Sequence, residues 1–311
     1  MCSCDLGRLV PSIFVSISSY RDLELKETIL DIINKSSGKH TINFGVHVSY
    51  LHPSEIDLPD IPNIQYTTSM APENVGVGMG RYISHQFYNN EDFYFQCDSH
   101  SRFVDGWDEI AIHSVLDYQI QGISKPLITM YPANYWYKDI SFKEIETDII
   151  DPYYRTNISF SQKPEEFKNL RIPSQTAVSA EGEIYTKSIS AGCVFTVGPF
   201  MAPNRDMAFW GEEIIMAARA YTHGYDMVVP KQQFMYHLYY NHEHSNPEIN
   251  RRKIFWHDFP EQFEAMNARS REIVYKTLTE GTVGDGLLGT KRTLDQYGSF
   301  AGLDFINGEV L

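Results

Sequence analysis

A short aromatic segment that ends abruptly in polar residues constrains this chain more than any other feature. The run Phe93–Cys97 is typical of a buried strand, and Asp98, Ser99 and His100 follow it directly. Asp98 and His100 are one residue apart, so at a strand end both side chains can reach the same point. In open α/β sheets, ligands bind beyond the carboxyl ends of strands. A carboxylate and an imidazole at one point suit a divalent cation such as Mn²⁺, and the alternative is a helix cap followed by a loop histidine.

Strand patterns alternate with helix patterns along the first half of the chain. Strands are expected at Ile13–Ser18, Asn43–Ser49, Ile64–Thr67, Asp92–Cys97 and Pro126–Tyr131, and helices at Leu25–Lys35, Arg81–Tyr88 and Trp107–Asp117. Later segments continue the pattern, with strands at Ser190–Val197, Tyr225–Val229 and Phe234–Tyr239, helices at Trp210–Tyr221 and Glu261–Leu278, and a Gly-rich tail from Gly281 to Gly289. This order predicts an α/β fold with a mostly parallel sheet. The region Ala133–Lys187 keeps no period and predicts an irregular or antiparallel insertion beside the site.

Composition limits the classes of partner. The 311 residues carry a formal net charge of −14, which argues against nucleic acid or an anionic membrane as the main partner. No stretch approaches the roughly 20 apolar residues that span a bilayer. The 4 cysteines form no disulfide framework, so a cytoplasmic location is the simplest expectation. Cys2 and Cys4 could bind a metal or belong to a frayed terminus.

A third metal ligand can come from the late aromatic segment Tyr236–Tyr239. A histidine in such a strand is commonly a core residue, but together with Asp98 and His100, His237 becomes a candidate ligand. Three protein ligands leave positions open for a substrate, as catalytic metal sites require. His242 and His244 compete for this role, although their polar context is typical of a surface loop.

The segment Phe209–Glu213 combines a tryptophan, a glycine and two acids. Trp210 offers a flat face for a sugar ring, and Glu212 and Glu213 could hold sugar hydroxyls or an acceptor. Two acids in a first helical turn also interact favourably with the helix dipole, which is the alternative explanation. Both explanations can hold together.

Two further segments could meet a nucleotide. Past the first strand, Tyr20 could stack on a base and Arg21 could meet a phosphate or an acid; the alternative is an ordinary turn with a surface ion pair. The glycines of Gly76–Arg81 would allow a phosphate to approach a helix N-terminus. Their spacing matches neither the dinucleotide fingerprint nor the P-loop.

Several strings, taken in order, resemble the cytoplasmic N-acetylglucosaminyltransferases that modify a hydroxyproline on a ubiquitin-ligase adaptor. These strings are Ile13–Asp22, Asp98–Phe103, Trp107–Glu109, Ser190–Gly192, Phe209–Glu213, Tyr236–Tyr239, Gly289–Leu294 and Ala301–Phe305. The chain is also similar to the polypeptide N-acetylgalactosaminyltransferases, whose Asp-x-His motif and later histidine bind the metal. The resemblance covers nearly the whole chain.

The resemblance implies a GT-A fold, which is a Rossmann-like mixed sheet flanked by helices, together with a UDP-sugar donor and Mn²⁺ or another divalent cation. It implies the metal ligands Asp98, His100 and His237, the nucleotide-pocket residues Ser18, Tyr20, Arg21, Arg81, Ala191 and Gly192, and the sugar- and acceptor-side residues Trp210, Glu212 and Glu213. It further implies one catalytic domain, 1–311, with a nucleotide-binding half (8–132), a variable insertion (133–189) and a metal and acceptor half with the C-terminal tail (190–311).

The expected reaction moves a hexosamine, by resemblance GlcNAc, from a UDP-sugar to a hydroxyl of a protein hydroxyproline, serine or threonine, with retention. No residue stands out as a covalent nucleophile, so a front-face substitution is the working hypothesis. The alternatives are a glycan or modified DNA base as acceptor, a non-catalytic UDP-sugar-binding protein, and a metal hydrolase.

Two departures from the family pattern concern the acceptor. The usual signature continues from the histidine into a nearby arginine, whereas here Tyr240, Asn241 and His242 follow and Arg251 and Arg252 come later. The insertion Ala133–Lys187 contains no motif that matches the family. Acceptor contacts commonly lie in such variable regions.

Overall fold

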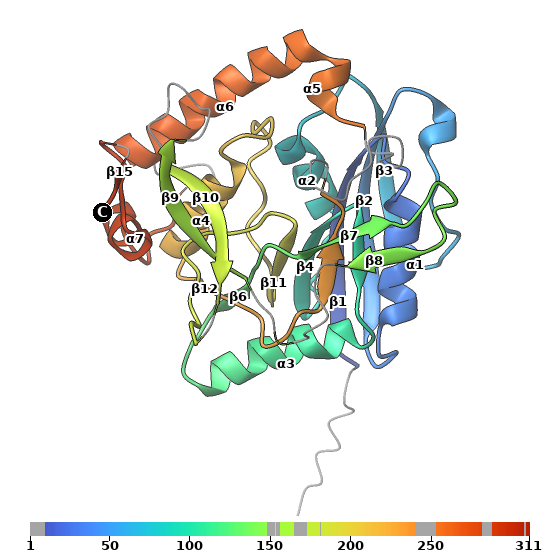
Figure 1. Ribbon diagram of the computed structural model, residues 1–311, viewed down its shortest axis with the longest axis horizontal. Helices are drawn as coiled ribbons and strands as arrows, with labels where there is room; N and C mark the ends of the chain where they lie inside the picture. Colours follow the sequence, from blue (N-terminus) through green and yellow to red (C-terminus); the bar gives the residue numbers. More distant parts are fainter. Residues whose placement is uncertain are drawn as a thin grey trace, which may run out of the picture.

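A mixed β-sheet forms the centre of the protein (Figure 1). The computed structural model describes residues 10–147, 153, 156–164, 173–180, 182–239, 253–281, 288–307 and 309–311. Within these ranges the main sheet has 7 strands in the order β12-β6-β11-β4-β1-β2-β3. The strands are Ser12–Tyr20 (β1), Thr41–Tyr50 (β2), Ile64–Met70 (β3), Phe93–Asp98 (β4), Pro126–Ile128 (β6), Cys193–Val197 (β11) and Asp226–Val228 (β12). Neighbouring strands are parallel except at β11, which is antiparallel to both β4 and β6.

Helices cover both faces of this sheet, because its central strands are apolar on both sides. The helices are Leu25–Lys35 (α1), Val77–His85 (α2), Trp107–Ile120 (α3), Glu212–Thr222 (α4) and Pro260–Glu280 (α6). Alternate residues of β1 enter different cores. Ile13 packs in the cluster that holds α1 and α3, whereas Phe14 packs in the cluster that holds α4 and α6. The expected α/β architecture, a mixed sheet flanked by helices, is confirmed.

A second, smaller sheet brings the late histidine to the end of β4. Its order is β5-β13-β7-β8, with bounds Ser101–Phe103 (β5), Ala133–Tyr137 (β7), Ile145–Thr147 (β8) and Met235–His237 (β13). Only Ser99 and His100 separate β4 from β5. Because β13 runs antiparallel to β5 with His237 opposite Ser101, that histidine is placed beside the polar turn.

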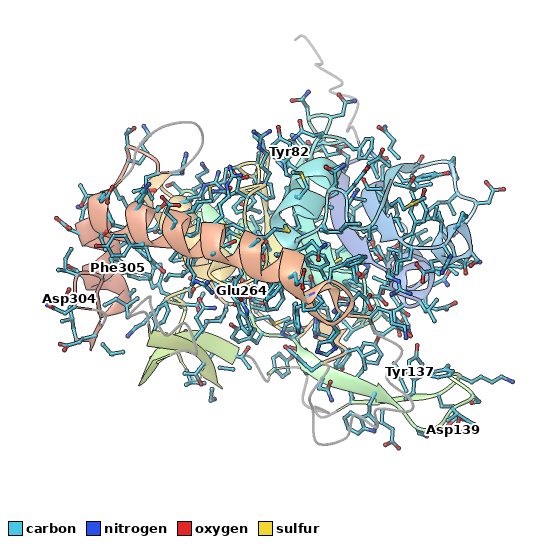
Figure 2. The ribbon with its side chains drawn as sticks, turned by 90° about the horizontal axis from the view of Figure 1, so that it is seen from above. Tyr82, Tyr137, Asp139, Glu264, Asp304 and Phe305 are labelled. Carbon is cyan, nitrogen blue, oxygen red and sulfur yellow. The ribbon has the colours of Figure 1, made fainter. Side chains whose placement is uncertain are left out.

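Within its described residues, the central insertion forms two antiparallel strand pairs, as one of the two expectations for it stated. β7 pairs with β8, and Thr156–Pro164 (β9) pairs with Pro173–Ser179 (β10). Figure 2 shows the β7–β8 hairpin, with Tyr137 and Asp139 labelled, at the edge of the molecule. Arg102 of β5 donates to Glu24 at 2.6 Å and Tyr137 donates to the same carboxylate, so the hairpin is tied to the start of α1.

The sequence prediction placed the start of α2 too late. The helix begins at Val77, and the glycines expected to precede it lie at its start and inside it. Close packing is the reason: a Cβ on Gly80 would lie 2.0 Å from Oγ of Ser18, so only glycine lets α2 approach β1. The helix also ends at His85, before the expected Tyr88.

The C-terminal part holds more regular structure than the sequence prediction gave it. A short helix, Phe255–Asp258 (α5), precedes α6, and Leu294–Ala301 (α7) follows the Gly-rich segment, with Leu303–Asp304 (β14) paired to Glu309–Val310 (β15). Thr293 and Gln296 form a capping box at the start of α7, a signal that was present in the sequence. Residues 282–287 of the Gly-rich tail lie outside the described residues. None of the helices within the described ranges combines the length and apolar character that a membrane crossing requires.

Candidate functional site

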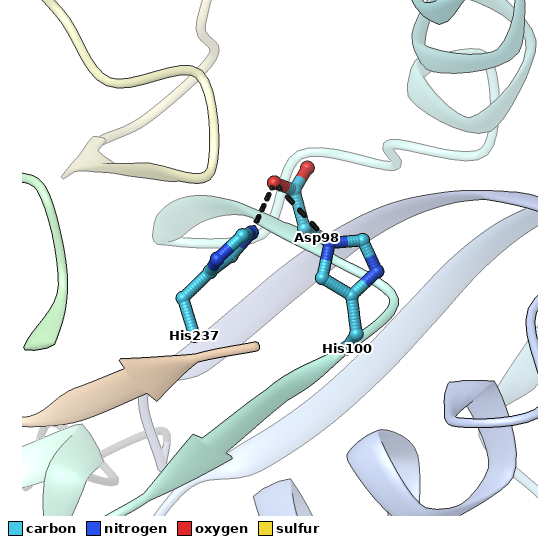
Figure 3. Close-up of side chains that lie close together, drawn as sticks. All are labelled: Asp98, His100 and His237. Atoms are coloured by element: carbon cyan, nitrogen blue, oxygen red, sulfur yellow. Dashed lines mark hydrogen bonds and ion pairs between the residues drawn. The ribbon is translucent and has the colours of Figure 1, made fainter. Parts of the chain in front are cut away.

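Asp98, His100 and His237 meet at the carboxyl end of β4 (Figure 3). One donor atom from each lies within 4.8 Å of the others. Nε2 of His237 is 3.0 Å from Oδ2 of Asp98, and Nε2 of His100 is 4.0 Å from the same oxygen. The structure therefore gathers the carboxylate and the two imidazoles around one point. The competing His242 and His244 lie outside the described residues, as do Cys2, Cys4 and the segment 240–252.

The chemistry of this cluster fits a divalent cation. Nε2 of His100 is buried and has no hydrogen-bond partner within the described part of the chain. Burying a polar nitrogen without a partner is costly, and a metal ion that accepts its lone pair removes that cost. Nδ1 of the same ring contacts Oδ2 of Asp22 at 2.6 Å, an arrangement common among metal-binding histidines. Asp22 was not among the site residues predicted from the sequence, although it ends the first resembling string.

Arg81 of α2 is buried between two carboxylates. Its Nη2 lies 2.7 Å from Oδ1 of Asp98, and its Nη1 lies 2.5 Å from Oε2 of Glu212. Burial opposes ionisation of Asp98, but the guanidinium of Arg81 and the imidazole of His237 outweigh it. They hold the pKa of the Asp98 carboxyl well below its usual range. The candidate ligand is thus kept anionic, as cation binding requires.

Gly192 leaves open the space in front of Asp98. A Cβ at this position would lie 2.8 Å from Oδ2 of Asp98 and 3.8 Å from Cδ2 of His237. Real Cβ atoms do not approach an oxygen so closely, so a side chain here would have to displace the carboxylate. The absence of a side chain at Gly192 preserves the geometry of the cluster.

We expect Gly192→Ala to weaken Mn²⁺ binding by about 10- to 100-fold, because the added methyl group pushes Asp98 away from the histidines. The same overpacking should lower the free energy of unfolding by only about 1–3 kcal/mol. Calorimetric titration with Mn²⁺ and urea unfolding measure the two effects separately. Unchanged Mn²⁺ affinity in the folded variant would show that Oδ2 of Asp98 is not a ligand.

Two clefts meet at the cluster. The first lies between the end of β1, the start of α2 and helix α5, and its lining includes Ser18, Ser19, Tyr20, Asp22, Ser49, Gly76 and Val77. The second lies beside the start of α4 and the β9–β10 pair, and its lining includes Tyr131, Gln175, Ala191, Gly192, Trp210, Glu212, Glu213 and Tyr239. Asp98 and Arg81 line both clefts, so a ligand group from either side can reach the cluster.

The structure separates Tyr20 from Arg21. Tyr20 lines the first cleft, where its hydroxyl donates to Asp258 at 2.8 Å and its ring meets Phe255 edge-on. Arg21 is outside the lining of both clefts, because its guanidinium is paired with Glu55 at 2.7 Å and with Asp258 at 2.6 Å. Arg21 therefore ties the end of β1 to α5, close to the cleft but not in it.

Aromatic rings line the site at a place that the sequence prediction foresaw only in part, since it named Trp210 but not Trp256. Trp256 of α5 lines both clefts, 4.7 Å from Phe209 and 6.3 Å from Trp210 between ring centroids. Trp210 stays 37% exposed, so its ring is available on the second cleft. The aromatic residues around Phe255 and Trp256 were the sequence signal for this part of the site. Nothing in that segment, however, indicates that Trp256 lies beside Trp210, 46 positions earlier in the sequence.

Three donors converge on the carboxylate of Glu213 in the second cleft. The N–H of Ala191 donates to Oε1 at 2.9 Å, while the Tyr131 hydroxyl and the Gln175 amide donate to Oε2 at 2.8 Å and 2.6 Å. Burial outweighs these donors and raises the pKa of Glu213 to about 7. Glu212 differs, because its Oε1 is buried with no hydrogen-bond partner among the described residues, and burial raises its pKa too.

Glu213→Gln is expected to make the stability less dependent on pH. The unfolded carboxyl titrates near its ordinary value of about 4.3. Between that value and about 7, the folded protein therefore holds more protons than the unfolded chain. As the pH rises from about 5 to about 8, the wild type should then lose roughly 2–3 kcal/mol of stability relative to the variant. Urea unfolding of both proteins at about pH 5 and about pH 8 measures this difference, and a constant difference contradicts the raised pKa.

The chain was compared with solved structures, curated proteins and protein-family models. Two solved structures of residues 1–349 of S. aureus TarS, one of them in complex with UDP-GlcNAc, are similar to this chain with a TM-score of 0.41 each. Their sequences are 11% and 9% identical to it, and the similarity covers 96% of this chain and 72% and 71% of theirs. None of the curated proteins compared with the chain matches it.

A family model described as glycosyltransferase (GlcNAc) matches residues 12–56 and 60–307. The match includes both clefts and all three residues of the cluster. The chain therefore belongs to the GlcNAc glycosyltransferase family and is a glycosyltransferase.

Proposed function

We propose that this glycosyltransferase moves GlcNAc from UDP-GlcNAc to a protein hydroxyl and that a divalent cation, Mn²⁺ in the first instance, is required. The observation that carries the proposal is the cluster of Asp98, His100 and His237 at the junction of two clefts. Residues 1–311 would act as one catalytic domain, with the donor nucleotide in the first cleft and the acceptor in the second.

The donor half of the proposal follows from the first cleft. Tyr20 supplies a ring for the base, and Ser18 and the start of α2 lie along the path to the cluster. Asp98, His100 and His237 would hold the cation. When bound, the cation would neutralise negative charge that develops on the departing diphosphate. Arg81 adds a fixed positive charge beside Asp98, in a buried environment where such a charge acts strongly.

The acceptor half follows from the second cleft. Trp210 and Trp256 present aromatic faces that suit the apolar face of a sugar. Oε1 of Glu212, buried and without a partner among the described residues, can accept a hydrogen bond from a sugar or acceptor hydroxyl. By resemblance, that acceptor is a hydroxyproline, serine or threonine of a protein.

Retention without a covalent intermediate is the proposed stereochemical course. Apart from Asp98 of the cluster, the carboxylates among the described residues that line the second cleft are those of Glu212 and Glu213. Glu212 is held by Arg81, and three donors surround Glu213, so neither is free to attack the sugar. This arrangement supports a front-face substitution in which the acceptor hydroxyl enters on the side that the diphosphate leaves.

The deciding experiment is a panel of UDP-sugars assayed with Mn²⁺ and with EDTA. UDP release is monitored, and peptides that contain hydroxyproline, serine or threonine are then analysed by mass spectrometry. We expect UDP-GlcNAc to be the preferred donor, with transfer to peptide lost in EDTA. Release of UDP with no transfer to any acceptor would indicate a hydrolase, and no release from any UDP-sugar would overturn the proposal.

A further inference from the structure

Asp22 has no part in the reaction described above, yet it is buried against the metal cluster. It is 8% exposed, and its Oδ2 lies 2.6 Å from Nδ1 of His100. The hydroxyl of Ser99 donates to the same oxygen at 2.6 Å, and the N–H of Glu24 donates to Oδ1 at 2.9 Å. Because a carboxylate oxygen accepts, the proton at the contact with His100 lies on Nδ1.

That proton fixes the state of the other ring nitrogen. A neutral imidazole has one N–H, so an N–H at Nδ1 leaves Nε2 of His100 with a free lone pair. Nε2 is buried, has no hydrogen-bond partner within the described ranges, and faces Oδ2 of Asp98 at 4.0 Å. The opposite tautomer would place a hydrogen atom on Nε2 and block it as a ligand.

The backbone holds Asp22 firmly in this position. Arg21 adopts φ 50, a left-handed conformation that is costly for a residue with a Cβ and persists where the surroundings enforce it. The ion pairs of Arg21 with Glu55 and Asp258 provide that enforcement from two sides. The resulting turn directs Asp22 toward the β4–β5 connection, where it lines the first cleft beside His100.

We propose that Asp22 is a positioning residue that fixes the tautomer and the ring orientation of His100, and so presents Nε2 to the divalent cation. This inference rests on the proposed function, in which the cluster binds a cation. A carboxylate on the second nitrogen of a metal-binding histidine also raises the basicity of the first. In this role Asp22 acts through its contact with Nδ1 of His100.

The chain contains a matched control for this contact. Asp108 is fully buried and accepts the same three kinds of donor, at the start of α3 and outside the lining of both clefts. Nδ1 of His40 lies 2.8 Å from its Oδ2, the Ser37 hydroxyl donates to Oδ2 at 2.6 Å, and the Ser37 N–H donates to Oδ1 at 2.8 Å. Asp22→Asn and Asp108→Asn therefore disturb equivalent hydrogen bonds, and only the first lies next to a proposed ligand.

Calorimetric titration of the full chain with Mn²⁺ alone, without donor or acceptor, tests the inference. We expect Asp22→Asn to weaken Mn²⁺ binding by about 10- to 100-fold and Asp108→Asn to leave it unchanged. Both variants should lose similar stability toward urea. If the wild type binds no Mn²⁺, the proposed function fails; if the wild type binds it and Asp22→Asn binds equally tightly, the inference about Asp22 alone fails.

Histidine tautomers give a second readout that does not depend on how well a variant folds. In metal-free wild type labelled with ¹⁵N-histidine, the NMR signals of His100 are assigned with His100→Gln. Nδ1 should appear protonated and Nε2 unprotonated. A protonated Nε2 in the wild type would overturn the inference, whatever the titrations show.

Discussion

Asp98→Asn is expected to reduce Mn²⁺-dependent sugar transfer by about 1,000-fold or more while the protein stays folded. The substitution keeps the shape of the side chain but removes the anionic oxygen that faces both histidines. The pKa of this carboxyl lies well below its usual range, so the wild type presents a full negative charge at any working pH. Steady-state transfer over a range of Mn²⁺ concentrations measures the loss.

The control for Asp98→Asn is a measurement that the variant is still folded. Far-UV circular dichroism and the midpoint of urea unfolding should show a folded variant, because Arg81 keeps Glu212 as a partner. Saturating Mn²⁺ should not restore activity. Transfer at the wild-type rate would remove Asp98 from the metal site and with it the main support for a metal-dependent reaction.

Arg81→Met is expected to produce the largest loss of stability among the changes considered, about 3–5 kcal/mol in the free energy of unfolding. The methionine fills much of the volume but leaves the buried carboxylate of Glu212 and the partly buried carboxylate of Asp98 without their shared cation. Breaking a buried ion pair from one side is costly because the remaining charge stays in a poorly solvated place. Urea unfolding at neutral pH measures the loss.

The same substitution, made in a variant that lacks the carboxylates of Asp98 and Glu212, tests this explanation. In Asp98→Asn/Glu212→Gln, Arg81→Met should cost much less than it does in the wild type, since no uncompensated carboxylate remains. An equal cost in both backgrounds would mean that Arg81 stabilises the protein through packing of its aliphatic part, and that its ion pairs contribute little.

Local patterns in the sequence were sufficient for most of the fold. The helix Leu25–Lys35 was predicted at its observed bounds, because its apolar residues recur at helical spacing and Ser36 and Ser37 follow. The strand predicted at Asp92–Cys97, from an apolar run with a polar end, is observed one residue later, at Phe93–Asp98. Periodicity and turn residues are local properties, so no knowledge of the tertiary structure was needed. The start of α2 was missed for the opposite reason, since the close packing of Gly80 on Ser18 depends on a distant strand.

The candidate site was only partly accessible from the sequence. The three residues of the cluster could be proposed from ligand chemistry and resemblance. The pairing of Arg81 with Glu212 spans 131 positions, and the contact of His100 with Asp22 spans 78. Neither leaves a local pattern, because each partner is chosen by how α2, α4 and the first turn pack against β4. Contacts of this kind become visible only when the tertiary structure places the elements together.

The two-residue connection between β4 and β5 has a consequence for the mechanics of the protein. Asp98 ends the main sheet, while His237 belongs to the small sheet that carries the β7–β8 hairpin. A cation bound by Asp98 and His237 would link the main sheet to the small sheet near the connection between β4 and β5. Binding would then stabilise the folded state by mass action, and the gain should be greatest at this connection. The cation proposed for the chemistry would thus also hold the small sheet, with its β7–β8 hairpin, against the main sheet.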